Sequence, residues 1–263
     1  MDTSQRTSDP AADNGHHDRR RLLRGFNLSL AAVLALLAVF TLQDQLDLAR
    51  LAVSPRDPAA WLGLLTAPLL HGSPAHLLAN ASAILILGTL CLAVYPRATA
   101  RGLALMWLGS GLGAWALGQA GSHHLGASGV THGLLFMLAT LGLLRRDRAS
   151  IAAGMIGFLF YGGMLLTVLP HEPGVSWQSH LGGALGGLLA GVLLRRADPL
   201  PPRPRYSWED EEEQAAARAA AGPDPELEPP SPTNVPVLWQ RRPPPSRAVV
   251  VRLVPRPRQP PRP

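Results

Sequence analysis

Trp177-Gln-Ser-His180-Leu-Gly-Gly183-Ala-Leu-Gly-Gly187-Leu-Leu-Ala-Gly191 is the stretch of sequence that decides the fold. Glycines recur every four residues at Gly183, Gly187 and Gly191, so they line one face of a helix and let another helix approach closely. His180 precedes Gly183 by three residues and belongs near the same face. The pattern predicts an apolar helix that packs tightly on a neighbour and directs His180 toward that neighbour rather than toward lipid.

Six apolar stretches fill the chain between Leu22 and Leu194, and each has about the length that a membrane-spanning helix needs. They are residues 22–42, 74–95, 102–119, 127–144, 149–169 and 177–194. The mean hydropathy of the 263 residues is only +0.11, because polar ends are averaged with this region. We therefore expect an all-α membrane protein, a bundle of six transmembrane helices with a long first outer loop.

Arginines predict the orientation of this bundle, because short loops rich in arginine stay on the cytoplasmic side of a membrane. Clusters precede the first predicted span, join the second to the third and the fourth to the fifth, and follow the sixth: Arg19, Arg20, Arg21, Arg24, Arg97, Arg101, Arg145, Arg146, Arg148, Arg195 and Arg196. Both termini are then cytoplasmic. We expect an integral multi-pass protein of a bacterial inner membrane.

Composition divides the chain into three parts. Residues 1–20 are a polar cytoplasmic N-terminus, and residues 21–196 are the membrane domain. Residues 197–263 hold 18 of the 26 prolines and ten arginines, and such a composition cannot bury a hydrophobic core. We expect this last part to be a disordered cytoplasmic tail, and the sequence identifies no partner for it.

The net charge of +6 and the isoelectric point near 10.8 are values that nucleic-acid-binding proteins share. Here the arginines mark predicted helix ends and do not form one patch with interleaved aromatic residues. We exclude nucleic acid as a partner and attribute the basic character to membrane topology. The lipid bilayer is the partner that this composition predicts.

Three polar residues on different predicted spans lie at one depth. The spacing to the arginine that ends each span is 17 residues for Asn80, 17 for Ser128 and 15 for His180. At about 1.5 Å per residue, all three lie roughly 22 to 26 Å above the cytoplasmic face, within a hydrocarbon core of about 30 Å. A carboxamide, a hydroxyl and an imidazole in one layer favour a hydrolytic site.

Each of these side chains has a chemical interpretation and a simpler structural one. Ser128 offers a nucleophilic hydroxyl at a helix N-terminus, although small residues around it more often serve helix packing. His180 is a candidate base, and otherwise a buried hydrogen-bonding group. His76 and Asn80, four residues apart on one helix face, offer N–H donors to an oxyanion, and otherwise bond to neighbouring helices.

The residues available at this depth exclude other hydrolytic chemistries. No carboxylate is present there, so a serine hydrolase site works as a Ser-His dyad rather than as a triad. The chain has no His-Glu-x-x-His pair for zinc and no two buried aspartates. The single Cys91 fits packing, and His123 with His124 fits a solvated pair better than a metal site. We expect neither a metal nor a cofactor.

His71-x4-His76-x3-Asn80, Gly126-x-Ser128-Gly129 and His180-x2-Gly183-x3-Gly187 together resemble the rhomboid family of intramembrane serine proteases. The resemblance covers about residues 20–196. It implies a serine endopeptidase that cleaves peptide bonds in or near transmembrane helices of membrane protein substrates. The roles it implies are nucleophile for Ser128, general base for His180, and an oxyanion hole of His76, Asn80 and the Ser128 N–H, with Gly126 shaping the loop and His71 supporting the helix start.

Other positions agree with the family pattern or depart from it. Trp61 and Thr66 resemble it, in a first loop expected to lie partly in the outer leaflet. His132 departs from it, because the family often has an aromatic residue one turn after the serine; His132 can stack on His180 or change its protonation.

Two alternative functions stay open on the sequence. Ser-Gly-x-x-His also resembles rhombosortases, which process C-terminal sorting helices. The other alternative is a non-proteolytic rhomboid-like protein that binds membrane clients, although such relatives usually lack the serine or the histidine.

Overall fold

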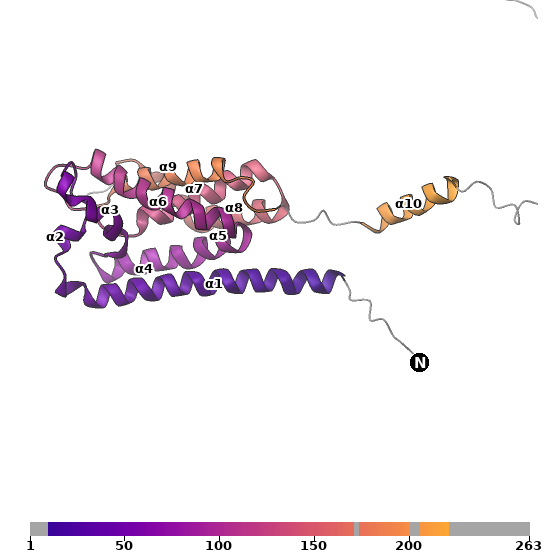
Figure 1. The fold of residues 1–263 in the computed structure, drawn as a ribbon, viewed down its shortest axis with the longest axis horizontal. Helices are drawn as coiled ribbons and strands as arrows, with labels where there is room; N and C mark the ends of the chain where they lie inside the picture. Colours follow the sequence, from indigo (N-terminus) through magenta and orange to yellow (C-terminus); the bar gives the residue numbers. More distant parts are fainter. Residues whose placement is uncertain (1–9, 171–173, 200–205, 221–263) are drawn as a thin grey trace, which may run out of the picture. The chain divides into compact units, whose positions relative to one another are not determined.

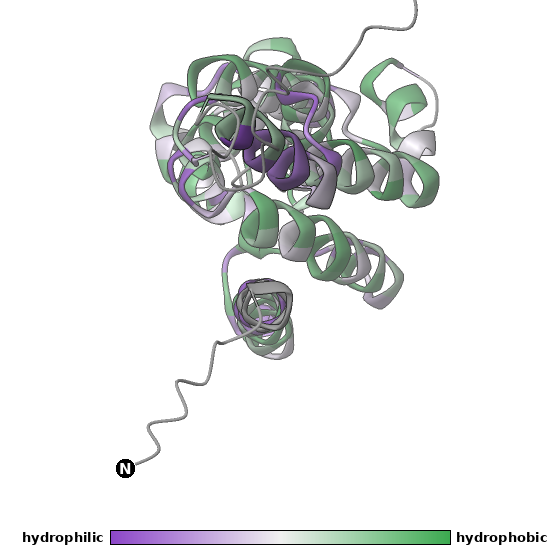
Figure 2. Ribbon diagram, turned by 90° about the vertical axis from the view of Figure 1, so that its right-hand side faces the viewer, coloured by the Kyte–Doolittle hydropathy of each residue, from purple (hydrophilic) through white to green (hydrophobic). Residues whose placement is uncertain are grey.

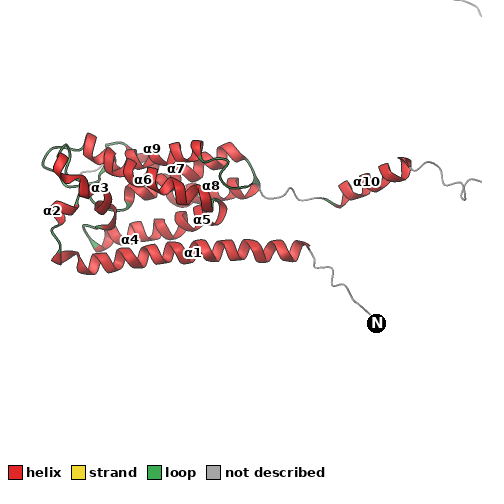
Figure 3. Cartoon of the chain, viewed as in Figure 1, coloured by secondary structure: helices red, strands yellow, loops and turns green. Residues whose placement is uncertain are grey.

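The computed structural model describes residues 10–170, 174–199 and 206–220. The chain forms two units, Met1–Pro201 and Pro202–Pro263, and each is described by itself. Within the described residues every regular element is a helix (Figure 3), apart from one isolated bridge between Val53 and His124. The prediction of an all-α protein is confirmed for this part of the chain.

The α-helices of the first unit, within its described residues, are α1 (Pro10–Leu42), α2 (Leu48–Leu51), α3 (Gly63–Thr66), α4 (Pro74–Ala83), α5 (Thr89–Val94), α6 (Pro96–Leu117), α7 (Ser128–Arg145), α8 (Arg148–Tyr161) and α9 (Trp177–Leu193). Short 3-10 segments are η1 (Gln43–Gln45), η2 (Pro58–Leu62), η3 (Ala67–Leu69) and η5 (Gly162–Val168), and η4 (Ile84–Gly88) is a π-helical turn. The second unit contains α10 (Ser207–Ala220).

The long helices of the first unit lie side by side, and the short helices α2 and α3 gather at one end of them (Figure 1). α6, α7 and α9 pack most closely on one another, whereas α1 lies at the edge of the bundle against α5 and η4. Hydrophobic residues predominate along these helices (Figure 2). Large apolar side chains are exposed on α8, among them Leu159 and Phe160, as expected where a helix faces lipid.

Four segments among the described residues are long and apolar enough to cross a bilayer: Asp18–Gln45, Pro74–Val94, Ser128–Arg145 and Arg148–Val168. They coincide with four of the six predicted spans, so the protein is an integral membrane protein. The other two predicted spans correspond to α6 and α9. α9 has 17 residues, which at about 1.5 Å each gives a length of roughly 26 Å, slightly less than the bilayer core.

One glycine face of α9 packs directly on α7. A Cβ atom added at Gly183 or Gly187 would collide with the backbone carbonyl of Gly129 or Gly133, respectively. The two helix backbones therefore touch at these positions, which only residues without a side chain allow. The close-packing face predicted from the glycine spacing is confirmed.

A second glycine face of α9 packs on α6. Gly182 lies against the carbonyl of Gly109, and Gly186 lies against the carbonyl of Leu105. Adjacent residues on a helix point about 100° apart, so the two members of a neighbouring glycine pair face different helices. In α9, one glycine of each pair contacts α6 and the other contacts α7. The glycine spacing in the sequence predicted only one such face, which the structure directs toward α7.

The long first loop is tied to the loop that precedes α7. Val53 and His124 exchange two backbone hydrogen bonds of 2.9 Å. The hydroxyl of Thr66 donates to the Leu51 carbonyl at 2.6 Å, which closes the first loop on itself. The Trp61 side chain is 63% exposed at this end of the bundle, as expected for a ring at the membrane interface.

The membrane domain extends further than the predicted boundary after residue 196. The Asp198 carboxylate is 4% exposed and accepts hydrogen bonds from the backbone N–H groups of Arg97 and Ala98, at 3.0 and 2.9 Å. It thus caps the start of α6, where free N–H groups and the helix dipole favour an anion. The side chain of Arg145 donates to the Asp198 carbonyl at 3.0 Å. These bonds hold the chain in the first unit, which ends at Pro201.

Helices lie across both of the regions predicted at the ends of the chain. α1 begins at Pro10 and runs through the predicted boundary between residues 20 and 21. The prediction of disorder throughout residues 197–263 is wrong for Ser207–Ala220, which forms α10. This segment has acidic residues in its first turn, Arg218 in its last turn and several alanines, and all three features favour a helix. The parts of both predictions that fall on residues 1–9, 200–205 and 221–263 lie outside the described residues.

Gly187→Ala is expected to destabilise the bundle, because its Cβ would push α9 away from the Gly133 carbonyl. Overpacking of this kind costs about 1 to 3 kcal/mol. Thermal unfolding in detergent micelles measures the change. The matched control is Gly154→Ala on α8, where the nearest atom to an added Cβ is the Leu138 carbonyl oxygen at 3.8 Å. Equal unfolding temperatures for the two variants would contradict the close contact.

Candidate active site

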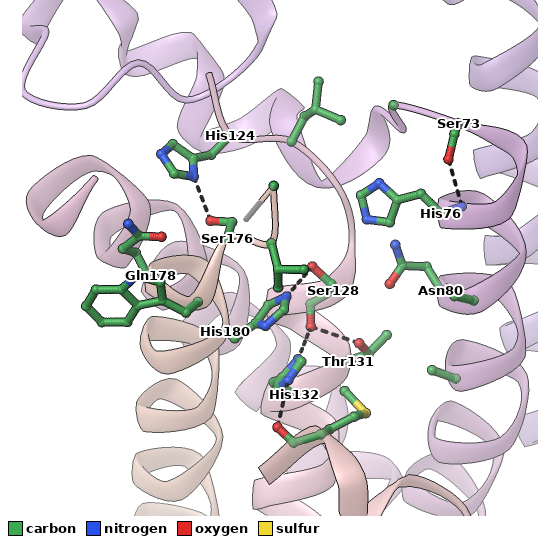
Figure 4. A pocket seen from close by; sticks show the side chains of 18 of the residues that line it. Ser73, His76, Asn80, His124, Ser128, Thr131, His132, Ser176, Gln178 and His180 are labelled. Atoms are coloured by element: carbon green, nitrogen blue, oxygen red, sulfur yellow. Dashed lines mark hydrogen bonds between the residues drawn. The ribbon is translucent and has the colours of Figure 1, made fainter. Parts of the chain in front are cut away.

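Ser128 and His180 meet at the N-terminal ends of two packed helices. Ser128 is the first residue of α7, and His180 lies in the first turn of α9, which begins at Trp177. Nε2 of His180 is 2.9 Å from Oγ of Ser128 (Figure 4). The His180 side chain is buried, whereas Ser128 is partly buried. The structure therefore brings these two predicted site residues within hydrogen-bonding distance.

The other edge of the His180 ring faces η5, the 3-10 segment that continues α8. Nδ1 of His180 is 2.9 Å from the backbone carbonyl oxygen of Thr167. A backbone carbonyl thus occupies the place that a carboxylate has in a Ser-His-Asp triad.

His132 stacks on His180, one of the two possibilities that the sequence left open. The ring centroids are 3.9 Å apart and the ring planes differ by 14°. Nδ1 of His132 is 2.6 Å from the Ser128 carbonyl oxygen, and its Nε2 is 2.8 Å from the Thr167 hydroxyl. His132 therefore has contacts at both ring edges and on one ring face.

His76 and Asn80 face Ser128 from α4, across the cavity (Figure 4). Ser73 caps this helix by accepting a hydrogen bond from the His76 backbone N–H at 3.1 Å. Asn80 is 3% exposed, and its Nδ2 group is buried without a hydrogen-bond partner among the described residues. A buried donor without a partner is costly, so this amide is available to an acceptor that enters the cavity.

Gly126 shapes the loop between α6 and α7. Its φ angle of +117° favours glycine, and a Cβ at this position would lie 2.5 Å from Cε1 of His76. Its backbone N–H donates to the Ala67 carbonyl at 2.9 Å, which ties the loop to the first outer loop. Gly126 thus lets the chain pass close beside the His76 ring on its way to Ser128.

His71 lies beneath His76, just before the start of α4. The rings meet edge to face with their centroids 5.1 Å apart. Gln43, at the end of the first span, donates to the His71 carbonyl at 2.6 Å and accepts from the His71 N–H at 3.2 Å. His71 is fully buried, and neither ring nitrogen has a hydrogen-bond partner among the described residues. These contacts hold the His71 ring in place against the His76 ring.

Ser128, His180, His76, Asn80 and His132 all line one cavity of about 1180 Å³. The cavity is partly open and has both polar and apolar walls. All five side chains named for the site therefore reach one space that water or an extended peptide can occupy.

His124, in the connection between α6 and α7, bridges two serines. Its Nδ1 is 2.6 Å from the hydroxyl of Ser176, the N-cap of α9, and its Nε2 is 2.9 Å from the hydroxyl of Ser122. His123 lies 3.1 Å from the Ser54 hydroxyl. The described residues contain no group of three or more metal-ligating side chains.

Several residues around the dyad were not predicted from the sequence. The hydroxyl of Thr131 donates to the Ser128 carbonyl at 2.8 Å, and the hydroxyls of Ser110 and Ser179 join α6 to α9 at 2.7 Å. Thr167 contacts both imidazoles. Threonines and serines in apolar helices were the available signal, but they are too common there to be singled out.

The model of the rhomboid domain matches residues 58–197, which is more than half of the chain. Uncharacterized proteins of Mycobacterium bovis and Mycobacterium tuberculosis are each 38% identical over 178 residues, which cover 63% of this chain and 74% of the relative. An uncharacterized protein of Mycobacterium leprae is 38% identical over 140 residues, 50% of this chain and 55% of that protein. No solved structure matches.

The chain is thus a helical membrane protein with a serine and a histidine within hydrogen-bonding distance in its cavity. The chain belongs to the rhomboid family. The resemblance found in the sequence is therefore confirmed at the level of the family, whose members are generally intramembrane serine proteases.

His71 is expected to make the stability of the protein depend on pH. Burial, together with the nearby His76 ring, lowers the pKa of His71 from 6.5 to about 4. His71 therefore binds a proton more weakly in the folded protein than in the unfolded chain. The contribution of this difference to the free energy of unfolding is fully present above about pH 6.5 and is lost as the pH falls toward about 4. Thermal unfolding in detergent, followed by circular dichroism from about pH 7.5 to about pH 5, measures this loss.

His71→Gln is the variant that isolates this histidine. Its unfolding temperature is expected to change less with pH than that of the wild type, whereas Gly154→Ala keeps the wild-type dependence. An identical pH dependence in His71→Gln and the wild type would contradict the assignment.

Proposed function

We propose that the protein is an intramembrane serine endopeptidase that hydrolyses peptide bonds in or near the transmembrane helices of membrane protein substrates. The observation that carries the proposal is the 2.9 Å approach of His180 Nε2 to Ser128 Oγ inside the cavity. Membership of the rhomboid family supports it. A hydroxyl becomes an effective nucleophile when a base lies within hydrogen-bonding reach, which is the arrangement here.

In the first step, Ser128 Oγ attacks the scissile carbonyl carbon and its proton moves to His180 Nε2. The tetrahedral intermediate then collapses, the proton passes from His180 to the leaving nitrogen, and an acyl-enzyme remains on Ser128. Water then attacks the ester while His180 accepts its proton, and His180 passes that proton to Ser128 Oγ as the acid product leaves. His180 performs both proton transfers from one nitrogen.

The oxyanion of this reaction is assigned to donors that line the same cavity. Asn80 Nδ2 is buried without a partner among the described residues and faces Ser128 from α4. His76 lies one turn earlier on the same helix, and the backbone N–H of Ser128 belongs to a helix N-terminus, where N–H groups lack intrahelical partners. Donors arranged in advance around a developing charge stabilise the transition state strongly.

The lining of the cavity supports a substrate that binds as an extended segment. Its walls include Ala79 and Ala83 on α4, Tyr161 on α8 and Met164 on η5, together with Ser128. We propose that an extended segment of a substrate's transmembrane helix occupies this cavity and reaches Ser128. Unwinding of the substrate helix is needed because the backbone carbonyl must be exposed to the nucleophile.

We further propose a bundle of six spans with both termini on the cytoplasmic side of a bacterial inner membrane. Arg145, at the end of α7, donates to backbone carbonyls of Asp198 and Pro199, which follow α9, and Asp198 caps the start of α6. These contacts join the start of α6, the end of α7 and the segment after α9, and they support a position on the same side of the membrane for these three arginine-rich helix ends. This agrees with the rule that arginine-rich ends lie on the cytoplasmic side.

Ser128→Ala and His180→Ala are each expected to abolish cleavage, because one removes the nucleophile and the other removes the base. Purified protein in proteoliposomes with a panel of single-span substrates measures the rate. A fluorophosphonate probe, which reacts with activated serines, is expected to label the wild type and not Ser128→Ala.

Ser29→Ala serves as the matched serine control, since Ser29 lies on α1 and is not part of the cavity wall. It is expected to keep both labelling and cleavage. Unchanged cleavage by Ser128→Ala would refute the proposal. Binding of single-span proteins without labelling or cleavage would favour the client-binding alternative, and cleavage restricted to C-terminal sorting helices would favour the rhombosortase alternative.

Asn80→Ala is expected to lower kcat by about 10²- to 10³-fold, which is typical of the loss of one oxyanion donor. KM should change little, because the amide acts on a charge that exists only in the transition state. Steady-state kinetics on one cleaved substrate make this distinction. A rise in KM at constant kcat would instead assign Asn80 to substrate binding.

A further inference from the structure

η5 presents a free backbone carbonyl to the proposed base. Thr167 is the last but one residue of this 3-10 segment, and the last carbonyl groups of a helix have no partner within the helix. The carbonyl oxygen of Thr167 instead lies 2.9 Å from His180 Nδ1. A carbonyl oxygen can only accept a hydrogen bond, so Nδ1 of His180 must carry the hydrogen.

This bond determines the tautomer of His180. With its hydrogen on Nδ1, a neutral imidazole has an unshared electron pair on Nε2. Nε2 lies 2.9 Å from the Ser128 hydroxyl and can accept its hydrogen. The opposite tautomer would direct an N–H group at Ser128 and could not act as a base.

The hydroxyl of Thr167 holds the second imidazole. Nδ1 of His132 is 2.6 Å from the Ser128 carbonyl oxygen and therefore carries a hydrogen. Nε2 of the neutral His132 ring is then an acceptor, and the Thr167 hydroxyl lies 2.8 Å from it. The Met164 carbonyl oxygen lies 3.0 Å from the same hydroxyl and 3.2 Å from Nε2, so the hydroxyl hydrogen is shared between Nε2 and this carbonyl. Thr167 thus fixes the orientation of the His132 ring, which stacks on His180 at 3.9 Å.

We propose that Thr167 is a positioning residue for the general base: its carbonyl fixes the tautomer of His180, and its hydroxyl holds His132 against the His180 ring. The inference rests on the proposed function, because it assigns a role in that reaction. When Ser128 gives its proton to Nε2, the ring becomes positive, and the Thr167 carbonyl dipole stabilises that charge through the Nδ1–H bond. The carbonyl takes up no proton, so the proton stays on Nε2 until it passes to the leaving nitrogen.

The two functional groups of Thr167 can be tested separately. Thr167→Val keeps the carbonyl and the shape of the side chain but removes the hydroxyl, and it is expected to lower kcat by up to about 10²-fold, as small displacements of catalytic groups do. KM and the unfolding temperature are expected to stay near the wild-type values. Thr167→Ser restores the hydroxyl and is expected to recover most of kcat.

Thr140→Val is the matched control. Thr140 is a buried threonine on α7 whose hydroxyl donates to the Phe136 carbonyl of its own helix, away from the cavity. It is expected to keep the wild-type kcat. A wild-type kcat in Thr167→Val, or an equal loss in Thr167→Val and Thr167→Ser, would overturn the role of the hydroxyl.

The role of the carbonyl is read from the tautomer of His180 without any substrate. Nitrogen NMR of protein labelled with ¹⁵N-histidine, assigned by comparison with His180→Gln, is expected to show the hydrogen of His180 on Nδ1 in both the wild type and Thr167→Val. A hydrogen on Nε2, or rapid exchange between the two tautomers, would overturn the inference.

The two sets of measurements separate this inference from the proposed function. If the wild type cleaves its substrates but His180 carries its hydrogen on Nε2, the inference alone fails. If the hydrogen is on Nδ1 but neither cleavage nor fluorophosphonate labelling occurs, the proposed function fails, and with it the assignment of Thr167 to that reaction.

Discussion

Backbone contact between α9 and its two neighbours is the constraint on which the rest of the structure depends. The glycine pairs at 182–183 and 186–187 leave no side chain between α9 and either α6 or α7. Within lipid, helices gain little from hydrophobic burial, so close van der Waals contact has to supply the attraction between them. Because the carbonyls of α6 and α7 fit against these glycines, α9 cannot slide without collision. The depth of His180 relative to Ser128 is therefore fixed by packing.

Among the described residues, the site that results contains hydroxyls, imidazoles and carbonyls rather than carboxylates. This composition suits a location within the membrane, where a charged group is far more costly than a neutral one. His180 is held by a backbone carbonyl and a stacked ring, and both are neutral. The amide of Asn80 is one of several buried polar groups without a hydrogen-bond partner among the described residues, and it faces Ser128 across the cavity. An unpaired donor beside the proposed nucleophile fits a site prepared for a charge that appears only during reaction.

The sequence predicted those features that repeat or that depend on side-chain identity. The period of the glycines predicted the face of α9 that meets α7, and the similar spacing from terminal arginines predicted that Ser128 and His180 share one depth. It did not predict the face toward α6, because glycine spacing does not tell which helices flank α9. The Thr167 carbonyl could not be found either, since any residue supplies a carbonyl and only the end of η5 directs it at His180. Asp198 was missed because a lone acid in a proline-rich segment gives no sign that it caps α6.

The central claim is that packing of α9 against α7 assembles one site from Ser128, His180 and Asn80. An experimental structure of the protein after reaction with a fluorophosphonate tests it most directly. The predicted result is a phosphorus atom bonded to Ser128 Oγ, with its phosphoryl oxygen within hydrogen-bonding distance of Asn80 Nδ2 and His180 beside the new bond. An adduct on another residue, or a phosphoryl oxygen that points away from α4, would contradict the claim.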